Sequence, residues 1–150
     1  AKNYLEKRSL PIVIKASGQY SPEPLFIAEQ YTIGGAGSVR GFNPSALSGD
    51  SGYNATLELQ LSPLFAEQTI FNQKIGDTIK IALFADNGGV QRNDRQPGEA
   101  EDDYITSIGA GIRIYAGKTI SARLDHAWPE INKKYENKNA ETYLQMTAGF

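Results

Sequence analysis

The chain has 150 residues, which is the length of one domain. Its 40% hydrophobic and 21% charged residues match neither a disordered tail nor a bundle of membrane-spanning helices. A formal net charge of −2 argues against a general nucleic-acid binder, and the absence of cysteine excludes disulfides and thiolate metal sites. No run reaches the roughly 18 apolar residues that a membrane-spanning helix needs.

Six stretches alternate between apolar and polar residues with the two-residue period of β-strands. Between Tyr53 and Leu61, for example, Leu57 and Leu59 flank Glu58. In chain order the stretches are 10–19, 53–61, 79–86, 106–114, 120–125 and 143–150. We therefore expect six antiparallel strands, each with one apolar and one polar face.

The charged residues keep to the polar registers of these stretches. They are Lys15, Glu58, Lys80, Asp86, Arg113, Arg123 and Asp125. A charge that faces lipid near the membrane midplane costs about 2–4 kcal/mol, whereas a charge that faces the lumen of a barrel is tolerated. The pattern fits a transmembrane β-barrel, and it also fits a soluble β-sandwich with one face in water.

The connections favour the barrel. Residues 20–52, 87–103 and 129–141 form long polar loops, whereas the turn at 117–118 is tight. Long loops on one side and short turns on the other are typical of outer-membrane barrels, in which the long loops lie outside. Both chain termini are then expected on the periplasmic side.

The longest loop, 20–52, contains several glycines, among them Gly34, Gly35 and Gly41. They do not form a GxGxxG pattern and no Lys-Ser/Thr pair follows them, which argues against a phosphate-binding loop. We expect these glycines to allow close backbone packing or positive φ angles.

The two ends of the chain carry different signals. The start, Ala1-Lys2-Asn3-Tyr4, lacks the apolar segment of a signal peptide, so we expect a mature sequence or a part of a longer one. The end, Phe150, closes an alternating stretch with an aromatic residue. Such an end resembles the signal by which the outer-membrane assembly machinery recognises its clients, which makes that machinery an expected partner.

Two motifs resemble a known family. Val39-Arg40-Gly41-Phe42 resembles the signature of the Omp85 superfamily, in which it caps a long loop that folds into the barrel. Residues 29–35 and 48–50 resemble the two-partner-secretion transporters of the haemolysin-activator type, as do residues 124–129, where that family usually has an arginine in place of Trp128. Phe84-Ala85-Asp86-Asn87-Gly88 matches the family's Phe-x-Asp-x-Gly strand motif.

The resemblance covers residues 10–150 and implies the last six strands of a barrel of about sixteen. The whole chain, 1–150, is then the C-terminal part of an outer-membrane β-barrel, with residues 20–52 as a loop folded inward. Six strands are fewer than the roughly eight that close the smallest outer-membrane barrels. We expect that residues before Ala1 supply the other strands, that several chains combine, or that the segment has been redesigned to close.

The family's loop arginine reaches the acidic residue of the strand motif and holds the loop in the lumen, which implies that Arg40 pairs with Asp86. Glu58 matches a further acidic partner in the assembly-factor branch of the superfamily. The residues themselves agree, because both acids lie on inward registers and an arginine fork binds carboxylates bidentately. We call Arg40, Asp86 and Glu58 the loop latch. The flanking motif residues are Val39, Gly41, Phe42, Gly34 and Gly35 in the loop, and Phe84 and Gly88 in the strand.

The resemblance implies an outer-membrane pore that exports an unfolded partner protein. One alternative is an assembly factor that inserts β-barrel proteins, which shares Arg40 and Asp86, and another is a soluble β-sandwich binding module. The single histidine, His126, is expected beside Trp128 at a membrane rim, so we predict no catalysis, metal or cofactor. The expected partners are a secreted protein, outer-membrane lipids, the assembly machinery and the remaining strands or further chains.

Overall fold

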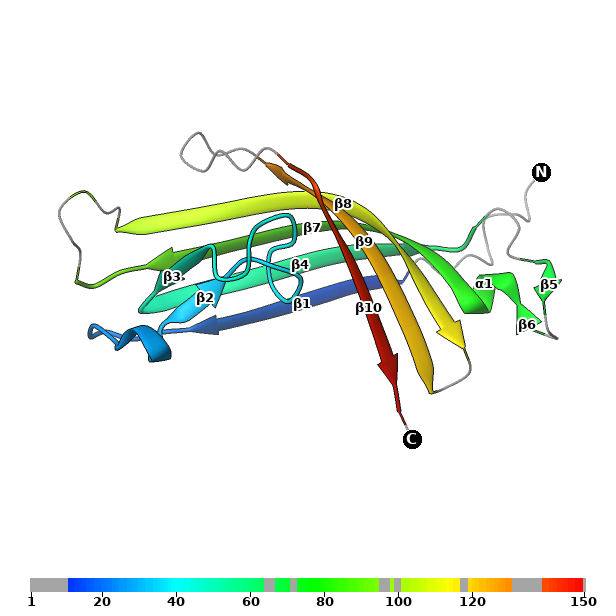
Figure 1. The fold of residues 1–150 in the computed structure, drawn as a ribbon, viewed down its shortest axis with the longest axis horizontal. Helices are drawn as coiled ribbons and strands as arrows, with labels where there is room; N and C mark the ends of the chain where they lie inside the picture. Colours follow the sequence, from blue (N-terminus) through cyan, green and yellow to red (C-terminus); the bar gives the residue numbers. More distant parts are fainter. Residues whose placement is uncertain are drawn as a thin grey trace.

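A computed structural model describes residues 11–63, 67–70, 73–94, 98, 101–116, 119–130 and 139–149. Its main feature is one antiparallel sheet of six strands, which follow one another in chain order (Figure 1). The strands are β1 (Ile12–Gln19), β4 (Ser51–Leu61), β7 (Ile79–Gln91), β8 (Asp102–Ala116), β9 (Ile120–Glu130) and β10 (Glu141–Ala148). The six antiparallel strands predicted by the alternation are confirmed, and the sheet is open and curved, as in a segment of a barrel wall.

The shorter elements lie in the connections. They are η1 (Ile27–Glu29), β2 (Tyr31–Ile33), β3 (Leu47–Gly49), β5 (Thr69–Ile70), β6 (Gln73–Lys74) and α1 (Ile75–Thr78). β2 pairs with β3, and this hairpin lies against β4 and β7 on one face of the sheet (Figure 1). Within the part of the chain that the structure describes, no helix has the length and hydropathy to cross a membrane.

Two predicted loops begin too early and end too late. β7 continues to Gln91 and pairs there with Asp102 of β8, and β9 continues to Glu130, which pairs with Thr106. The predicted loops 87–103 and 129–141 were therefore wrong in their bounds. Polar side chains mark the end of the apolar band, but the backbone hydrogen bonds of a strand pair do not need apolar side chains and continue beyond it.

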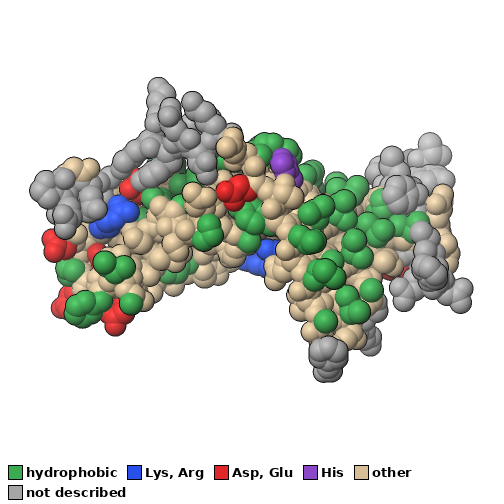
Figure 2. All heavy atoms as spheres, viewed as in Figure 1, with side chains coloured by type: hydrophobic (Ala, Val, Ile, Leu, Met, Phe, Trp, Pro, Cys, Tyr) green, Lys and Arg blue, Asp and Glu red, His purple; other side chains and the backbone are tan. Residues whose placement is uncertain are grey.

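The two faces of the sheet differ as the alternation requires. We call the face that carries residues 31–50 the inner face and the opposite one the outer face. Leu57 is 53% exposed on the outer face, whereas its neighbour Glu58 is 8% exposed on the inner face. Hydrophobic side chains gather over β9 and β10 in Figure 2. The exposed large apolar residues of these two strands include Ile120, Leu124, Leu144 and Met146.

His126 lies on the outer register of β9. Its ring meets that of Trp128 edge to face, with 4.6 Å between the centroids. Its Nδ1 is 2.8 Å from the Thr142 hydroxyl on β10. The histidine therefore lies beside Trp128, as predicted, and its polar ring atom is engaged by a neighbouring strand.

An apolar cluster fixes the long loop on the inner face. Its buried members are Ile33, Val39, Phe42, Leu47, Val90 and Ile105. The first four belong to the loop and the last two to β7 and β8. A Cβ atom on Gly88 would lie 3.0 Å from Val39 Cγ2 and 3.1 Å from Ile33 Cδ1, so a glycine there lets the loop approach the strand. The cluster brings the segment that carries Arg40 close to the sheet.

Asp50 joins the loops at one end of the sheet. Its carboxylate accepts hydrogen bonds from the backbone N–H groups of Leu25 at 2.8 Å and Asn93 at 2.7 Å, and from the Gln30 side chain at 3.3 Å. The bond from Asn93, followed by the bond from Leu25, holds the pKa of Asp50 below its ordinary value. One buried carboxylate thus connects the 20–30 segment, the start of β4 and the loop after β7.

Candidate functional site

The loop turns towards the strands through glycines in the left-handed region. The φ angles are 116° at Gly34, 86° at Gly35 and 90° at Gly41. Residues with a Cβ atom rarely adopt such positive angles. The Ser38 hydroxyl closes the turn, since it accepts a hydrogen bond from the Gly34 N–H at 2.8 Å and donates one to the Gly34 carbonyl at 3.1 Å. The motif residue that follows, Arg40, then points at the inner face.

Arg40 and Asp86 form a two-pronged ion pair. Arg40 Nε lies 2.7 Å from Asp86 Oδ2, and Nη2 lies 2.8 Å from Oδ1. The backbone N–H of Arg40 also donates to Oδ2 at 3.2 Å. Three donors from one residue therefore bind one carboxylate, which fixes the arginine more closely than a single charge contact does.

An aromatic ring supports the guanidinium. Arg40 Cζ lies 3.3 Å from the centroid of the Phe84 ring, within the range of a cation–π contact. The Phe84 ring covers Gly109, its cross-strand partner on β8, where any Cβ atom would overlap the ring. Two residues of the strand motif, Phe84 and Asp86, thus bind the same arginine by different interactions.

Asp125 on β9 connects Arg40 to a second arginine. Its Oδ2 accepts a hydrogen bond from Arg40 Nη1 at 3.0 Å, and its Oδ1 accepts one from Arg113 Nη1 at 2.5 Å. Arg113 in turn binds Glu58, with Nε 3.0 Å from Oε1 and Nη2 2.5 Å from Oε2. Acids and arginines therefore alternate from Asp86 through Arg40, Asp125 and Arg113 to Glu58.

We call these five residues the buried charge cluster: Arg40, Glu58, Asp86, Arg113 and Asp125. Each of their side chains is at most 10% exposed. They come from the loop and from four strands, β4, β7, β8 and β9. A buried ion network contributes little net stability, because desolvation offsets the attraction, but breaking one member is strongly destabilising. The cluster is therefore suited to specifying one position of the loop on the sheet.

A glycine makes room for the second half of the cluster. Gly111 lies opposite Asp125 on the neighbouring strand. A Cβ atom there would overlap Asp125 Oδ1 and would lie 2.8 Å from Arg113 Nη1. The contact between Asp125 and Arg113 thus requires a position without a side chain between them.

The predicted latch residues lie together, but not all in the expected pairs. Arg40 meets Asp86 directly, whereas the nearest approach of Arg40 to Glu58 is an ion pair of 3.7 Å without a hydrogen bond. Glu58 instead binds Arg113. Sequence reasoning placed Arg113 and Asp125 on inward registers but did not identify them as partners. Their signal was a charge of each sign on the polar registers of adjacent strands.

The other motif residues fall into three groups. Val39 and Phe42 belong to the apolar cluster, and Gly34 and Gly35 shape the turn. The Gly41 N–H donates a hydrogen bond to the Tyr143 hydroxyl on β10 at 2.9 Å, which gives the loop a further strand contact. Phe150, the predicted assembly signal, lies outside the described residues.

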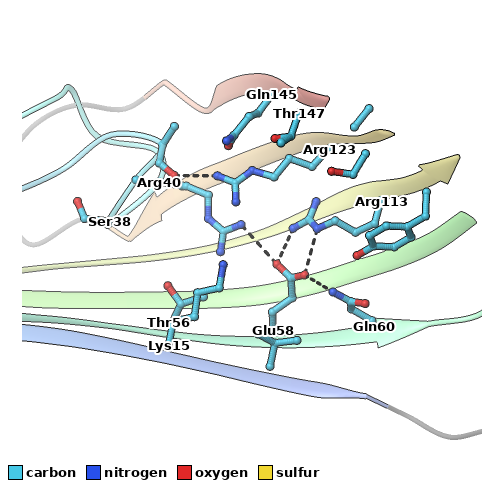
Figure 3. Close-up of a pocket in the computed structure, with 16 residues that line it drawn as sticks. Lys15, Ser38, Arg40, Thr56, Glu58, Gln60, Arg113, Arg123, Gln145 and Thr147 are labelled. Carbon is cyan, nitrogen blue, oxygen red and sulfur yellow. Dashed lines mark hydrogen bonds and ion pairs between the residues drawn. The ribbon is translucent and has the colours of Figure 1, made fainter. Parts of the chain in front are cut away.

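A polar cavity of about 280 Å³ opens beside the cluster on the inner face (Figure 3). Its wall includes the loop tip, residues 36–38, and the strand residues Lys15, Thr56, Gln60, Arg123, Gln145 and Thr147. Apart from the arginines and Glu58, the lining consists mainly of amides, hydroxyls and one amine, with Val13, Ala36 and Ala122 as its apolar side chains. Such a lining suits a wet path and not a tight apolar ligand site. Among the described residues, no group of three or more His, Cys, Asp or Glu side chains is placed to hold a metal ion.

Comparison with known proteins agrees with the motifs. A family model described as "Haemolysin secretion/activation protein ShlB/FhaC/HecB" matches residues 5–114, which is more than half of the chain. No curated protein and no solved structure matches the chain. The resemblance read from the loop and strand motifs is confirmed by the family match. The chain therefore belongs to the haemolysin secretion/activation family of two-partner-secretion transporters.

Proposed function

We propose that this chain forms part of the wall of an outer-membrane pore that exports one unfolded partner protein, with its long loop held inside the pore by Arg40. The observation that carries the proposal is the position of Arg40, which is buried on the inner face and hydrogen-bonded to Asp86 and Asp125 on two different strands. The family match supports export as the activity.

The outer face supports contact with outer-membrane lipids. Its exposed large apolar side chains include Ile14, Leu57, Ile81, Leu83, Ile108, Ile112, Leu124, Leu144 and Met146. Such a surface is costly in water and favourable against hydrocarbon. In this arrangement the loops joined by Asp50 lie at the external rim and both termini lie on the periplasmic side. Phe150 is then the residue that the barrel-assembly machinery recognises.

Further strands must complete the pore. Among the described strands, β1 and β10 each pair on one side only. A sheet edge in lipid leaves backbone groups without hydrogen bonds, and six strands are fewer than the roughly eight that close a barrel. We infer that other strands of the same protein, or further chains, pair with both edges, in a barrel of about sixteen strands of which this chain is the C-terminal part.

The experiment that tests this proposal replaces Arg40 in the full-length transporter by alanine, and separately by lysine. Without the guanidinium, Asp86 and Asp125 lose their shared partner, so we expect the loop to loosen and secretion of the partner protein to fall strongly. Lysine keeps the charge but not the fork, so it should restore secretion only in part. Arg92→Ala is the matched control, because Arg92 pairs with Asp103 outside the cluster.

Loop position is measured independently of secretion. Residues 1–150 contain no cysteine, so Gly37→Cys in a full-length transporter whose other cysteines, if any, are replaced by serine gives a single site for a thiol reagent. A Cβ atom at Gly37 meets nothing within 4 Å. Arg40→Ala should raise the labelling rate of this cysteine. Unchanged labelling together with unchanged secretion would contradict the proposal.

Two alternative functions make different expectations. An assembly factor would share Arg40 and Asp86 with a secretion pore. Deleting an assembly factor would lower the amounts of many outer-membrane proteins, whereas deleting a secretion pore would abolish the release of one partner protein. A soluble β-sandwich needs two facing sheets. The described residues form a single large sheet whose one face is apolar and exposed, which favours the pore.

A further inference from the structure

Arg123 on β9 stands between the loop tip and the buried charge cluster. Its Nη2 donates a hydrogen bond to the backbone carbonyl of Ala36 in the loop tip at 3.0 Å. Its Nε lies 3.6 Å from Asp125 Oδ2, which is an ion-pair distance but beyond the range of a hydrogen bond. That Nε atom is buried and has no hydrogen-bond partner among the residues that the structure describes.

The oxygen that Arg123 fails to reach is already bound. Asp125 Oδ2 accepts its hydrogen bond from Arg40 Nη1 at 3.0 Å. Two guanidinium groups therefore approach one carboxylate oxygen, and only the one from the loop binds it. A buried donor without a hydrogen bond carries a desolvation cost, so a rearrangement that supplies an acceptor lowers the free energy of the protein.

The surroundings leave Arg123 room to move. Its side chain is 27% exposed, and it lines the same polar cavity as Arg40 and the loop tip (Figure 3). Arg123 and Asp125 lie two residues apart on the same face of one strand, so their separation does not depend on the position of the loop. Arg40, in contrast, is carried by the loop.

We propose that Arg123 is a positioning residue that takes the place of Arg40 on Asp125 whenever Arg40 leaves. With the loop in place, Arg123 holds the tip through Ala36 and leaves Asp125 to Arg40. With Arg40 withdrawn, Arg123 Nε binds Asp125 Oδ2 and Nη2 releases the Ala36 carbonyl. The inference rests on the proposed role of Arg40 in holding the loop.

The exchange keeps every acid of the cluster except Asp86 beside an arginine of the strands. When Arg40 is absent, Glu58 and Asp125 face Arg113 and Arg123, so two acids meet two arginines. Asp86 loses its partner, but the loop segment that covered it has moved away and water reaches the carboxylate. The contact of Arg40 with Asp125 and the contact of Ala36 with Arg123 are then lost together, so the exchange couples release of the loop tip to withdrawal of Arg40.

The test compares single and double changes in the full-length transporter that carries the Gly37→Cys reporter. The variants are Arg123→Gln, Arg40→Gln and the two combined, and Arg92→Gln is the control. Arg123→Gln alone removes the tip contact, so it should raise the labelling rate several-fold. The decisive quantity is how far Arg123→Gln lowers the Tm of the barrel in the presence and in the absence of Arg40.

If Arg123 replaces Arg40, the loss in Tm from Arg123→Gln is larger in the Arg40→Gln background, since Asp125 then keeps only Arg113. If Arg123 does no more than hold the loop tip, Arg123→Gln lowers the Tm by a smaller amount in the Arg40→Gln background, since the loop is already loose there. An equal or smaller loss overturns the inference. If the proposed role of Arg40 in holding the loop is itself wrong, Arg40→Gln leaves both secretion and labelling unchanged, so this outcome is distinguished from failure of the inference about Arg123.

A second pair covers the case in which the double glutamine variant does not assemble. Arg40→Lys and Arg123→Lys keep both charges and remove only the forks, and the same comparison of Tm losses is made with them. The sign of the coupling is read in the same way. If Arg123→Lys lowers the Tm no more in the Arg40→Lys background than in the protein with Arg40, the proposed replacement of Arg40 by Arg123 on Asp125 is contradicted.

Discussion

Asp125 binds Arg40 through one carboxylate oxygen and Arg113 through the other, at 3.0 Å and 2.5 Å. The first arginine belongs to the loop and the second to β8, so this carboxylate couples the loop to the wall. Because Arg113 also holds Glu58 on β4, and Arg40 also binds Asp86 on β7, the position of the loop is set by the register of four strands at once. The contacts of Asp125 with Arg40 and Arg113 are the part of the site that the motifs alone did not reveal.

Replacing Asp125 by asparagine tests these contacts. The amide removes the charge shared by two buried arginines, and loss of one member of a buried ion network costs about 3–5 kcal/mol. We expect a lower free energy of unfolding in detergent, measured by urea titration, and faster labelling of a cysteine at Gly37. Asp102→Asn is the matched control, because Asp102 is exposed at the start of β8. Equal effects of the two changes would show that Asp125 has no special role.

An arginine on the outer face tests the membrane orientation. Leu57 is exposed there, next to the buried Glu58. Leu57→Arg should destabilise the inserted protein by about 2–4 kcal/mol if the position lies near the bilayer midplane. Thr147→Arg places the same side chain in the wall of the inner cavity, where water surrounds it, and should cost less. Unfolding from lipid vesicles measures both, and a similar cost for the two would argue against lipid contact of the outer face.

The loop junction at Asp50 should loosen in acid. Its pKa in the folded protein is lowered, so its hydrogen bonds stabilise the loops above the ordinary aspartate value, about 3.9, and are lost as the pH falls through the folded pKa. We expect the amides of Leu25 and Asn93 to lose protection from hydrogen exchange below about pH 4. Asp50→Asn removes the titrating group, so in this variant the protection of the Leu25 and Asn93 amides should not change with pH. Persistence of the pH dependence in Asp50→Asn would assign it to another group.

The two-residue alternation of the sequence was sufficient for the sheet. It predicted six antiparallel strands and the residues of each face, because the side chains of a strand point alternately to opposite sides and the charged residues keep to one of the two registers. It did not predict where β7, β8 and β9 end, since backbone pairing continues past the apolar residues. The loop motif and the strand motif together indicated that Arg40 and Asp86 meet, and the structure brings them within hydrogen-bond distance.

The tertiary structure alone decided which acid each arginine binds. Alternation places Glu58, Arg113, Arg123 and Asp125 on one face, but it does not give the offset between neighbouring strands. That offset sets Arg113 diagonal to Asp125 across Gly111, whose missing side chain leaves space for the carboxylate. It also leaves Arg123 opposite Arg113 and just beyond hydrogen-bonding range of Asp125. The sequence by itself determined a two-faced barrel wall with a loop arginine, whereas contacts between residues far apart in the chain decided how that arginine is held.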